Sequence, residues 1–73
     1  MKTLFATNYY VIGTNKDLKL FSEILAANIP VLTEHLEKQG KTIIPDIVEL
    51  MVAKEVANFL NLDFHNNIKD IKL

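Results

Sequence analysis

The first hydrophobic segment of the chain, residues 3–12, combines aromatic and β-branched side chains. Such residues favour extended backbone, because they pack well on a pleated surface. The segment therefore predicts a strand, and Asn8 leaves open whether it is one strand or a hairpin that turns at this residue. In a strand, Tyr9 and Tyr10 point to opposite faces, so one packs inward and the other faces outward.

Two helices are predicted between residues 14 and 40. Thr14 suits the N-cap of the first helix, with the acidic Asp17 three residues later, and apolar residues continue at helical spacing to about Ala27. Pro30 suits the first turn of a second helix, where a backbone N–H has no helical partner to lose. Gly40 would end that helix, because glycine readily adopts the left-handed conformation that follows a helix.

The second half of the chain is dominated by one long apolar pattern. Residues 41–44 predict a short second strand, and residues 45–62 predict a long helix that is apolar on more than one side. Such a helix lies in the centre of its domain or between two subunits. Phe64, Ile68 and Ile71 then follow at spacings of four and three residues, which predicts a short terminal helix.

Together these elements predict a small α+β fold: an N-terminal strand or hairpin plus three to four helices, with the helix 45–62 central. With 73 residues and 8.3 kDa, the chain is expected to form a single compact domain over residues 1–73. A chain of this size buries only about 60% of its unfolded surface, and it has no cysteine for disulfides. A homodimer is therefore expected, since association stabilises a small domain with surplus apolar surface.

The charged residues are balanced and interspersed. Eight basic residues, all of them Lys, stand against nine acidic ones, which leaves a net charge of −1. Nucleic-acid binding needs clustered cations, and Arg is the usual bidentate reader of phosphate and guanine, so this composition disfavours it. No apolar run is long enough to span a membrane and no signal peptide is evident, so a cytoplasmic protein without membrane contact is expected. The lack of Cys fits a reducing compartment.

The sequence carries no residue pattern that is typical of catalysis. Its one serine, Ser22, falls within a predicted helix, and Gly-rich phosphate loops are absent. His35 and His65, with the neighbouring Glu34 and Asp63, could supply metal ligands, but their spacing matches no metal motif. A boundary histidine and a solvated turn histidine are the more typical interpretations. We therefore expect no enzyme, no cofactor and no metal site.

One segment resembles a known family. Residues 54–62 read KEVANFLNL, which is similar to the first helix and turn of excisionase-type and MerR-type helix-turn-helix domains, often K-E-V-A-x-x-L-x-V. The resemblance implies a small DNA-binding regulator as the alternative function. A ribbon-helix-helix dimer with strand 3–12 as its ribbon is a second route to DNA, although neither face of that strand carries typical base-reading side chains.

The function that the sequence favours is a small non-enzymatic protein-interaction module, which modulates or inhibits another macromolecule by binding it. The Lys-, Asn- and Ile-rich composition suggests an AT-rich genome, and isolated domains of this length are often carried by phages or other mobile elements. Surplus apolar helix positions and an outward aromatic side chain are typical of partner contacts. The candidate partner interface consists of Tyr9, Tyr10, Ile47, Leu50, Met51, Phe64, Ile68 and Ile71.

Overall fold

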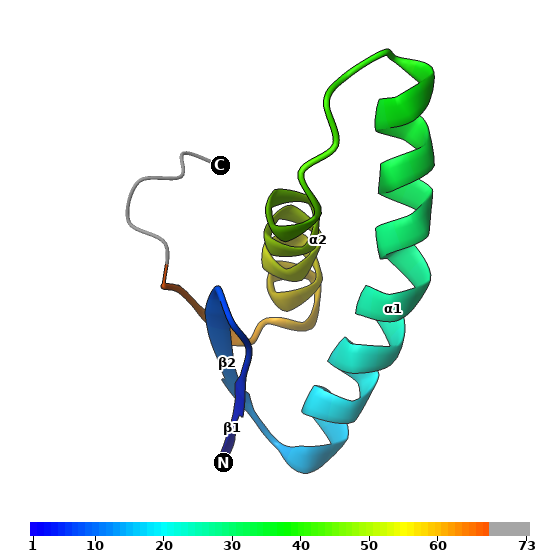
Figure 1. The fold of residues 1–73 in the computed structure, drawn as a ribbon. Helices are drawn as coiled ribbons and strands as arrows, with labels where there is room; N and C mark the ends of the chain where they lie inside the picture. The colour runs from blue at the N-terminus through cyan, green and yellow to red at the C-terminus, as the bar shows by residue number, and fades with distance from the viewer. Residues whose placement is uncertain (68–73) are drawn as a thin grey trace.

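The computed structural model of the chain describes residues 1–67 (Figure 1). In chain order its elements are the strands β1 (Lys2–Phe5) and β2 (Tyr9–Gly13), the helices α1 (Asn15–Lys38) and α2 (Pro45–Leu60), and the strand β3 (Asp63–Asn66). The strands form an antiparallel sheet in the order β1-β2-β3. The predicted α+β class is confirmed, but the described residues form two helices, not three or four.

The N-terminal segment is a hairpin, which resolves the alternative left open by Asn8. The turn between β1 and β2 is closed by a hydrogen bond from the backbone N–H of Ala6 to the carbonyl of Tyr9, at 2.9 Å. β3 returns after both helices and pairs with the other side of β2. The backbone N–H of Asn67 then donates to the carbonyl of Asn8 at 2.8 Å, so the end of β3 is tied to the hairpin turn.

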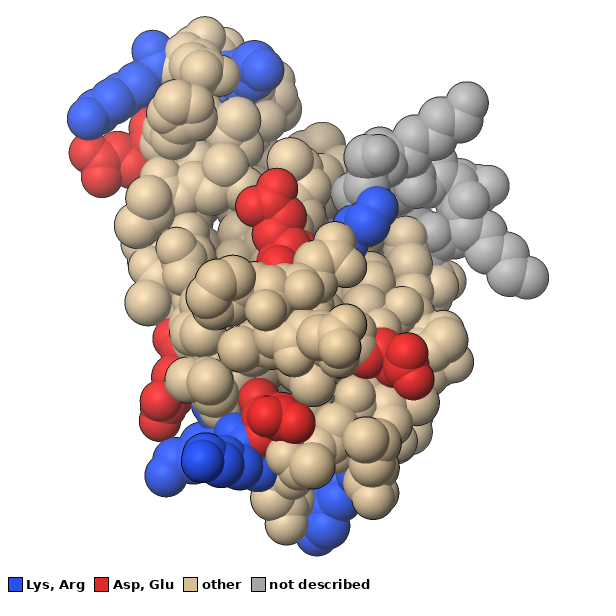
Figure 2. Space-filling view, turned by 180° about the vertical axis from the view of Figure 1, so that it is seen from behind, with Lys and Arg blue, Asp and Glu red and all other residues tan. Residues whose placement is uncertain are grey.

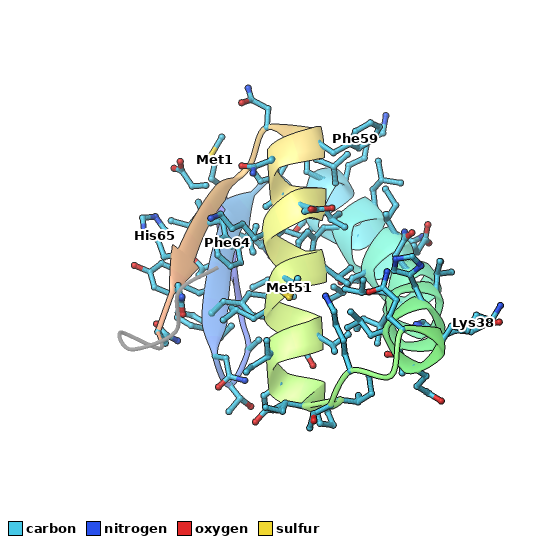
Figure 3. The ribbon with its side chains drawn as sticks, turned by 90° about the horizontal axis from the view of Figure 1, so that it is seen from above. Met1, Lys38, Met51, Phe59, Phe64 and His65 are labelled. Carbon is cyan, nitrogen blue, oxygen red and sulfur yellow. The ribbon has the colours of Figure 1, made fainter. Side chains whose placement is uncertain are left out.

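Side chains alternate across the sheet as its pleat requires. Leu4, Val11 and Phe64 share one register row and one face, and Val11 is fully buried there. Figure 3 shows both helices on one side of the sheet, with α2 between the sheet and α1. Tyr9 lies on this covered face with only 2% of its surface exposed, and Tyr10 lies on the opposite face, half-buried, as the strand pattern predicts.

The long helix of the second half is central, as predicted. α2 contributes six buried residues to the core, namely Val48, Leu50, Val52, Ala53, Val56 and Ala57. It ends two residues earlier than predicted, because Asn61 adopts the left-handed conformation with φ 58°. The N–H of Leu62 then donates to the carbonyl of Ala57 at 2.8 Å, a helix-terminating contact that turns the chain toward β3.

The two helices predicted for residues 14–40 are one continuous helix, so the predicted break at Pro30 is wrong. Proline inside a helix removes one backbone hydrogen bond and its ring crowds the preceding turn. The helix nevertheless continues, because Ile29, Leu32 and Leu36 pack against the core from both sides of the proline. Pro30 itself is exposed, so its ring faces away from that packing.

The predicted helix ends at residues 14, 40 and 45 are confirmed. The hydroxyl of Thr14 accepts the backbone N–H of Asp17 at 3.1 Å and so caps α1. Gly40 has φ 70°, and the following N–H, that of Lys41, donates to the carbonyl of Leu36 at 3.1 Å. Pro45 stands at the start of α2, where its missing N–H costs nothing.

Two short segments differ from prediction. Residues 41–44 are a loop, because they pair with no strand of the described residues 1–67. Asp63–Asn66 form β3 where a terminal helix was predicted, since all four residues pair with Tyr9–Ile12 of β2. The rest of that predicted helix, including Ile68 and Ile71, lies outside the described residues.

Candidate functional site: an apolar groove between the helices

An open groove of about 540 Å³ lies between α1 and α2, beside the place where the two helices pack against each other. Each wall is one stripe of residues at helical spacing. The α1 wall consists of Ile24, Asn28, Val31, Leu32 and His35, and the α2 wall consists of Met51, Val52, Glu55, Val56 and Phe59. The lining is mostly apolar: Val52 and Val56 are buried in the core, whereas other apolar residues of both walls remain exposed.

The groove exists because the two helices cross steeply. In Figure 1 α1 runs along the page and α2 is seen nearly end-on, so the helices separate on either side of their contact. Figure 3 looks onto the open side, with Met51 at the front of α2. At this opening Val31 is 63% exposed, Met51 39% and Phe59 78%. Large apolar side chains that gather at a hollow are typical of binding sites.

The groove holds few polar groups, and two of them already have partners. The side-chain amide of Asn28 donates to the carbonyl of Ile24 at 2.8 Å, within its own helix. The side-chain amide nitrogen of Gln39 lies 3.0 Å from Nε2 of His35. Glu55, on the α2 wall, is the one carboxylate among the lining residues. The groove therefore offers apolar contact along both walls and a negative charge on one of them.

The partner residues predicted from the sequence are not brought together. Leu50 is fully buried and, like Tyr9, belongs to the core, so neither presents a surface to a partner in this structure. Ile47 and Phe64 are half-buried. Met51 lies in the groove, and Tyr10 lies on the far face of the sheet, so these two belong to different surfaces.

Two principal groove residues, Val31 and Phe59, were not among the predicted contacts. In the sequence, Phe59 shares a helical stripe with the apolar Val52 and Val56, but periodicity shows which residues share a face and not how much of that face is covered. The available signal was Glu55, which interrupts the surface stripe Met51–Glu55–Phe59 with a charge. A charge within an apolar stripe marks the border between core and solvent.

Tyr9 has an unusual electrostatic environment, but it is a core residue. Burial raises the pKa of its hydroxyl to about 12, and the negative charge of Glu49 and a hydrogen bond to that carboxylate act in the same direction. Its ring stacks on Phe64 at 5.5 Å between centroids and meets the edge of Phe21 at 6.2 Å. The neutral hydroxyl thus serves packing between sheet and helices.

Residues for metal or nucleophilic chemistry are dispersed. Within residues 1–67, no group of three or more His, Asp or Glu side chains is arranged to hold a metal ion. His35 lies near the end of α1 and His65 on β3, and Ser22 is exposed on α1. In that same part of the chain, no helix has the length and apolar character needed to cross a membrane.

The charged side chains do not form a patch of one sign on the face seen in Figure 2, where Lys and acidic residues are mixed. The segment that resembles a helix-turn-helix, residues 54–62, covers the end of α2 and the turn after it. The next element is β3, so the described chain has a strand where that motif places its second helix.

Comparisons of the chain with protein-family models, with curated proteins and with solved structures find no match.

Proposed function

We propose that this chain is a protein-interaction module that binds an amphipathic helix of another protein in the groove between α1 and α2. The observation that carries the proposal is the apolar lining of the groove, with Phe59 78% exposed at its rim. Burying apolar surface contributes about 25 cal/mol per Å². Aromatic rings that become fully buried in a complex are among the residues that contribute most to binding energy.

A helix fits this groove better than an extended peptide does. An extended peptide gains most of its affinity by adding to a sheet edge, and both walls of this groove are helices whose backbone hydrogen bonds are internal. The side chains of α1 and α2 form ridges and grooves on the helix surfaces. A third helix can pack its own ridges into these grooves, as neighbouring helices in proteins do. Each wall stripe spans two to three helical turns, which suits anchors at i, i+4 and i+7 on the partner.

The charge of the groove specifies the partner further. Glu55 places a carboxylate on the α2 wall, beside Met51 and Phe59. A partner helix with a Lys or Arg next to its apolar stripe would pair with this carboxylate, and an acidic residue there would be repelled. We therefore expect the partner segment to be apolar on one face and basic along one border of that face.

Photocrosslinking tests which surface meets a foreign protein. Phe59 is replaced by the photoreactive analogue p-benzoylphenylalanine, and the chain is irradiated in a lysate of its source cells. Phe5 provides the matched control, because it is 79% exposed but lies on β1, away from the groove. The proposal expects position 59 to give a specific adduct with a protein other than the chain itself, and position 5 to give no adduct with that protein.

The adduct must also come from the groove itself. Adding Glu55→Lys to the chain with the position-59 analogue should reduce the yield of this adduct, since it places a positive charge where a basic border is expected to bind. Equal adducts with the same foreign protein from positions 59 and 5, or a yield that is insensitive to the charge at 55, would contradict the proposal.

A further inference from the structure

The face of the sheet opposite the helices carries a row of rings. Phe5 and Tyr10 are cross-strand partners with ring centroids 6.1 Å apart, and Tyr10 stacks on His65 at 4.7 Å with an interplanar angle of 13°. The row crosses all three strands of the sheet. We refer to this face, formed by Thr3, Phe5, Tyr10, Ile12, Asp63 and His65, as the outer face.

The outer face is not covered by the helices. Both helices lie on the other side of the sheet (Figure 3), and neither Tyr10 nor Ile12 belongs to the apolar cluster of the core. Phe5 is 79% exposed. An antiparallel sheet can keep one face in water, but that face is then mostly polar, whereas here the two central positions are Tyr10 and Ile12.

The order of residues on the outer face makes it complementary to itself. The second row across the sheet is Thr3, Ile12 and Asp63, parallel to the row of rings. Consider two copies of the sheet packed face to face, related by a two-fold axis that is parallel to the rows and lies midway between them. This axis places the row of rings of each copy opposite the second row of the other copy. It places Asp63 of each copy opposite His65 of the other, and Ile12 of each copy opposite Tyr10 of the other.

The third pair that the axis forms is Phe5 of each copy opposite Thr3 of the other. The first two pairs bring together favourable partners. Each copy contributes an acidic and an imidazole side chain, so two Asp63–His65 contacts form about the axis with no like charges facing. The two Ile12–Tyr10 contacts form the apolar centre. Aligned packing of two sheets is a standard arrangement, and an isologous interface requires a patch that matches itself.

We infer that the outer face is the interface of a homodimer, in which two sheets pack face to face with Asp63 opposite His65 of the second copy. The inference is independent of the groove, which opens between the helices and stays accessible in such a dimer. Each dimer would then present two partner-binding grooves.

Sedimentation equilibrium of the full chain tests this interface. The wild-type chain is expected at twice its 8.3 kDa mass. Ile12→Lys is expected to weaken dimerisation by about tenfold or more, because a cation replaces a central apolar contact. The same change keeps the monomer folded, because position 12 pairs with Asp63 across the strands of its own sheet. Far-UV circular dichroism checks that fold.

Exchanging the residues at positions 63 and 65 distinguishes this face-to-face dimer from dimers that use another surface or another orientation. His65→Asp alone places two carboxylates opposite each other and should yield monomer, whereas the double variant Asp63→His with His65→Asp restores opposite partners and should recover dimer. Phe59→Ser, in the groove, should leave the mass unchanged. A wild-type monomer, a dimer that Ile12→Lys does not weaken, or a dimer lost in Phe59→Ser would overturn the inference.

Discussion

Tyr9 is the residue at which the sheet meets both helices. Its ring contacts Phe21 of α1 and Phe64 of β3, and its hydroxyl is hydrogen-bonded to Glu49 of α2. The hydroxyl is buried, so its neutral form is favoured over the tyrosinate. The folded state therefore holds this proton to a higher pH than the unfolded state does.

This difference predicts alkaline sensitivity. The pKa of Tyr9 is about 12 in the folded chain, against 10.0 for an unperturbed tyrosine. Between these values the unfolded state releases the proton and the folded state keeps it. The neutral Tyr9 hydroxyl thus contributes its full stabilisation below pH 10. As the pH rises from 10 toward 12, the free energy of unfolding falls by about 2–3 kcal/mol. Urea unfolding across this range should show a steeper loss for wild type than for Tyr9→Phe, and parallel curves would refute the assignment.

At the scale of elements, α1 shows how packing can override a local signal. Asn15–Lys38 is continuous although Pro30 lies inside it, and the carbonyl of Ala26 is the acceptor that the missing N–H of Pro30 would have used. The residues that hold the helix together are apolar and lie on both sides of the proline. α1 therefore tolerates a residue that costs stability.

Removing the proline should stabilise the protein. Pro30→Ala restores the backbone N–H and relieves the crowding of the ring, and we expect the free energy of unfolding to rise by about 1–3 kcal/mol. Pro30→Gly restores the same N–H, but glycine is a poorer helix former than alanine. Its free energy of unfolding should therefore rise by about 1 kcal/mol less than that of Pro30→Ala. Chemical denaturation of the three chains measures both steps. A loss of stability in Pro30→Ala would mean that the ring contributes packing in α1.

The helix ends were predictable because they depend on a few adjacent residues. Thr14, Gly40 and Pro45 act through local hydrogen bonding or backbone conformation, which the sequence displays directly. β3 was not predictable in this way, because a four-residue segment carries little periodicity. Its conformation depends on pairing with β2, which lies at the other end of the chain.

At the scale of the whole molecule, the groove likewise combines features that local sequence predicts with features that depend on contacts between distant segments. The sequence identified α2 as central and apolar on more than one side, and it placed the surplus apolar surface in this half of the chain. It did not show that α1 crosses α2 steeply, and that crossing decides which apolar residues remain exposed. Leu50 is therefore buried and Phe59 exposed, although both belong to the same apolar helix.

The groove and the outer face lie on different sides of the sheet and carry separable predictions. Phe59 belongs to the groove and Phe5 to the outer face, and their exposed fractions are 78% and 79%. Substituting either ring removes the same amount of exposed aromatic surface. Differences between the two variants thus report on which surface is used and not on a general loss of apolar area.

The central claim is that another protein binds in the groove, and the dissociation constant of the partner found by crosslinking tests it most directly. Isothermal titration calorimetry with that purified partner would compare the wild-type chain with Phe59→Ser and Phe5→Ser. We predict that Phe59→Ser weakens binding by about thirtyfold, the effect of losing an aromatic ring that the partner buries, whereas Phe5→Ser leaves the constant within about twofold. Undiminished binding by Phe59→Ser, or equal losses in both variants, would contradict the claim.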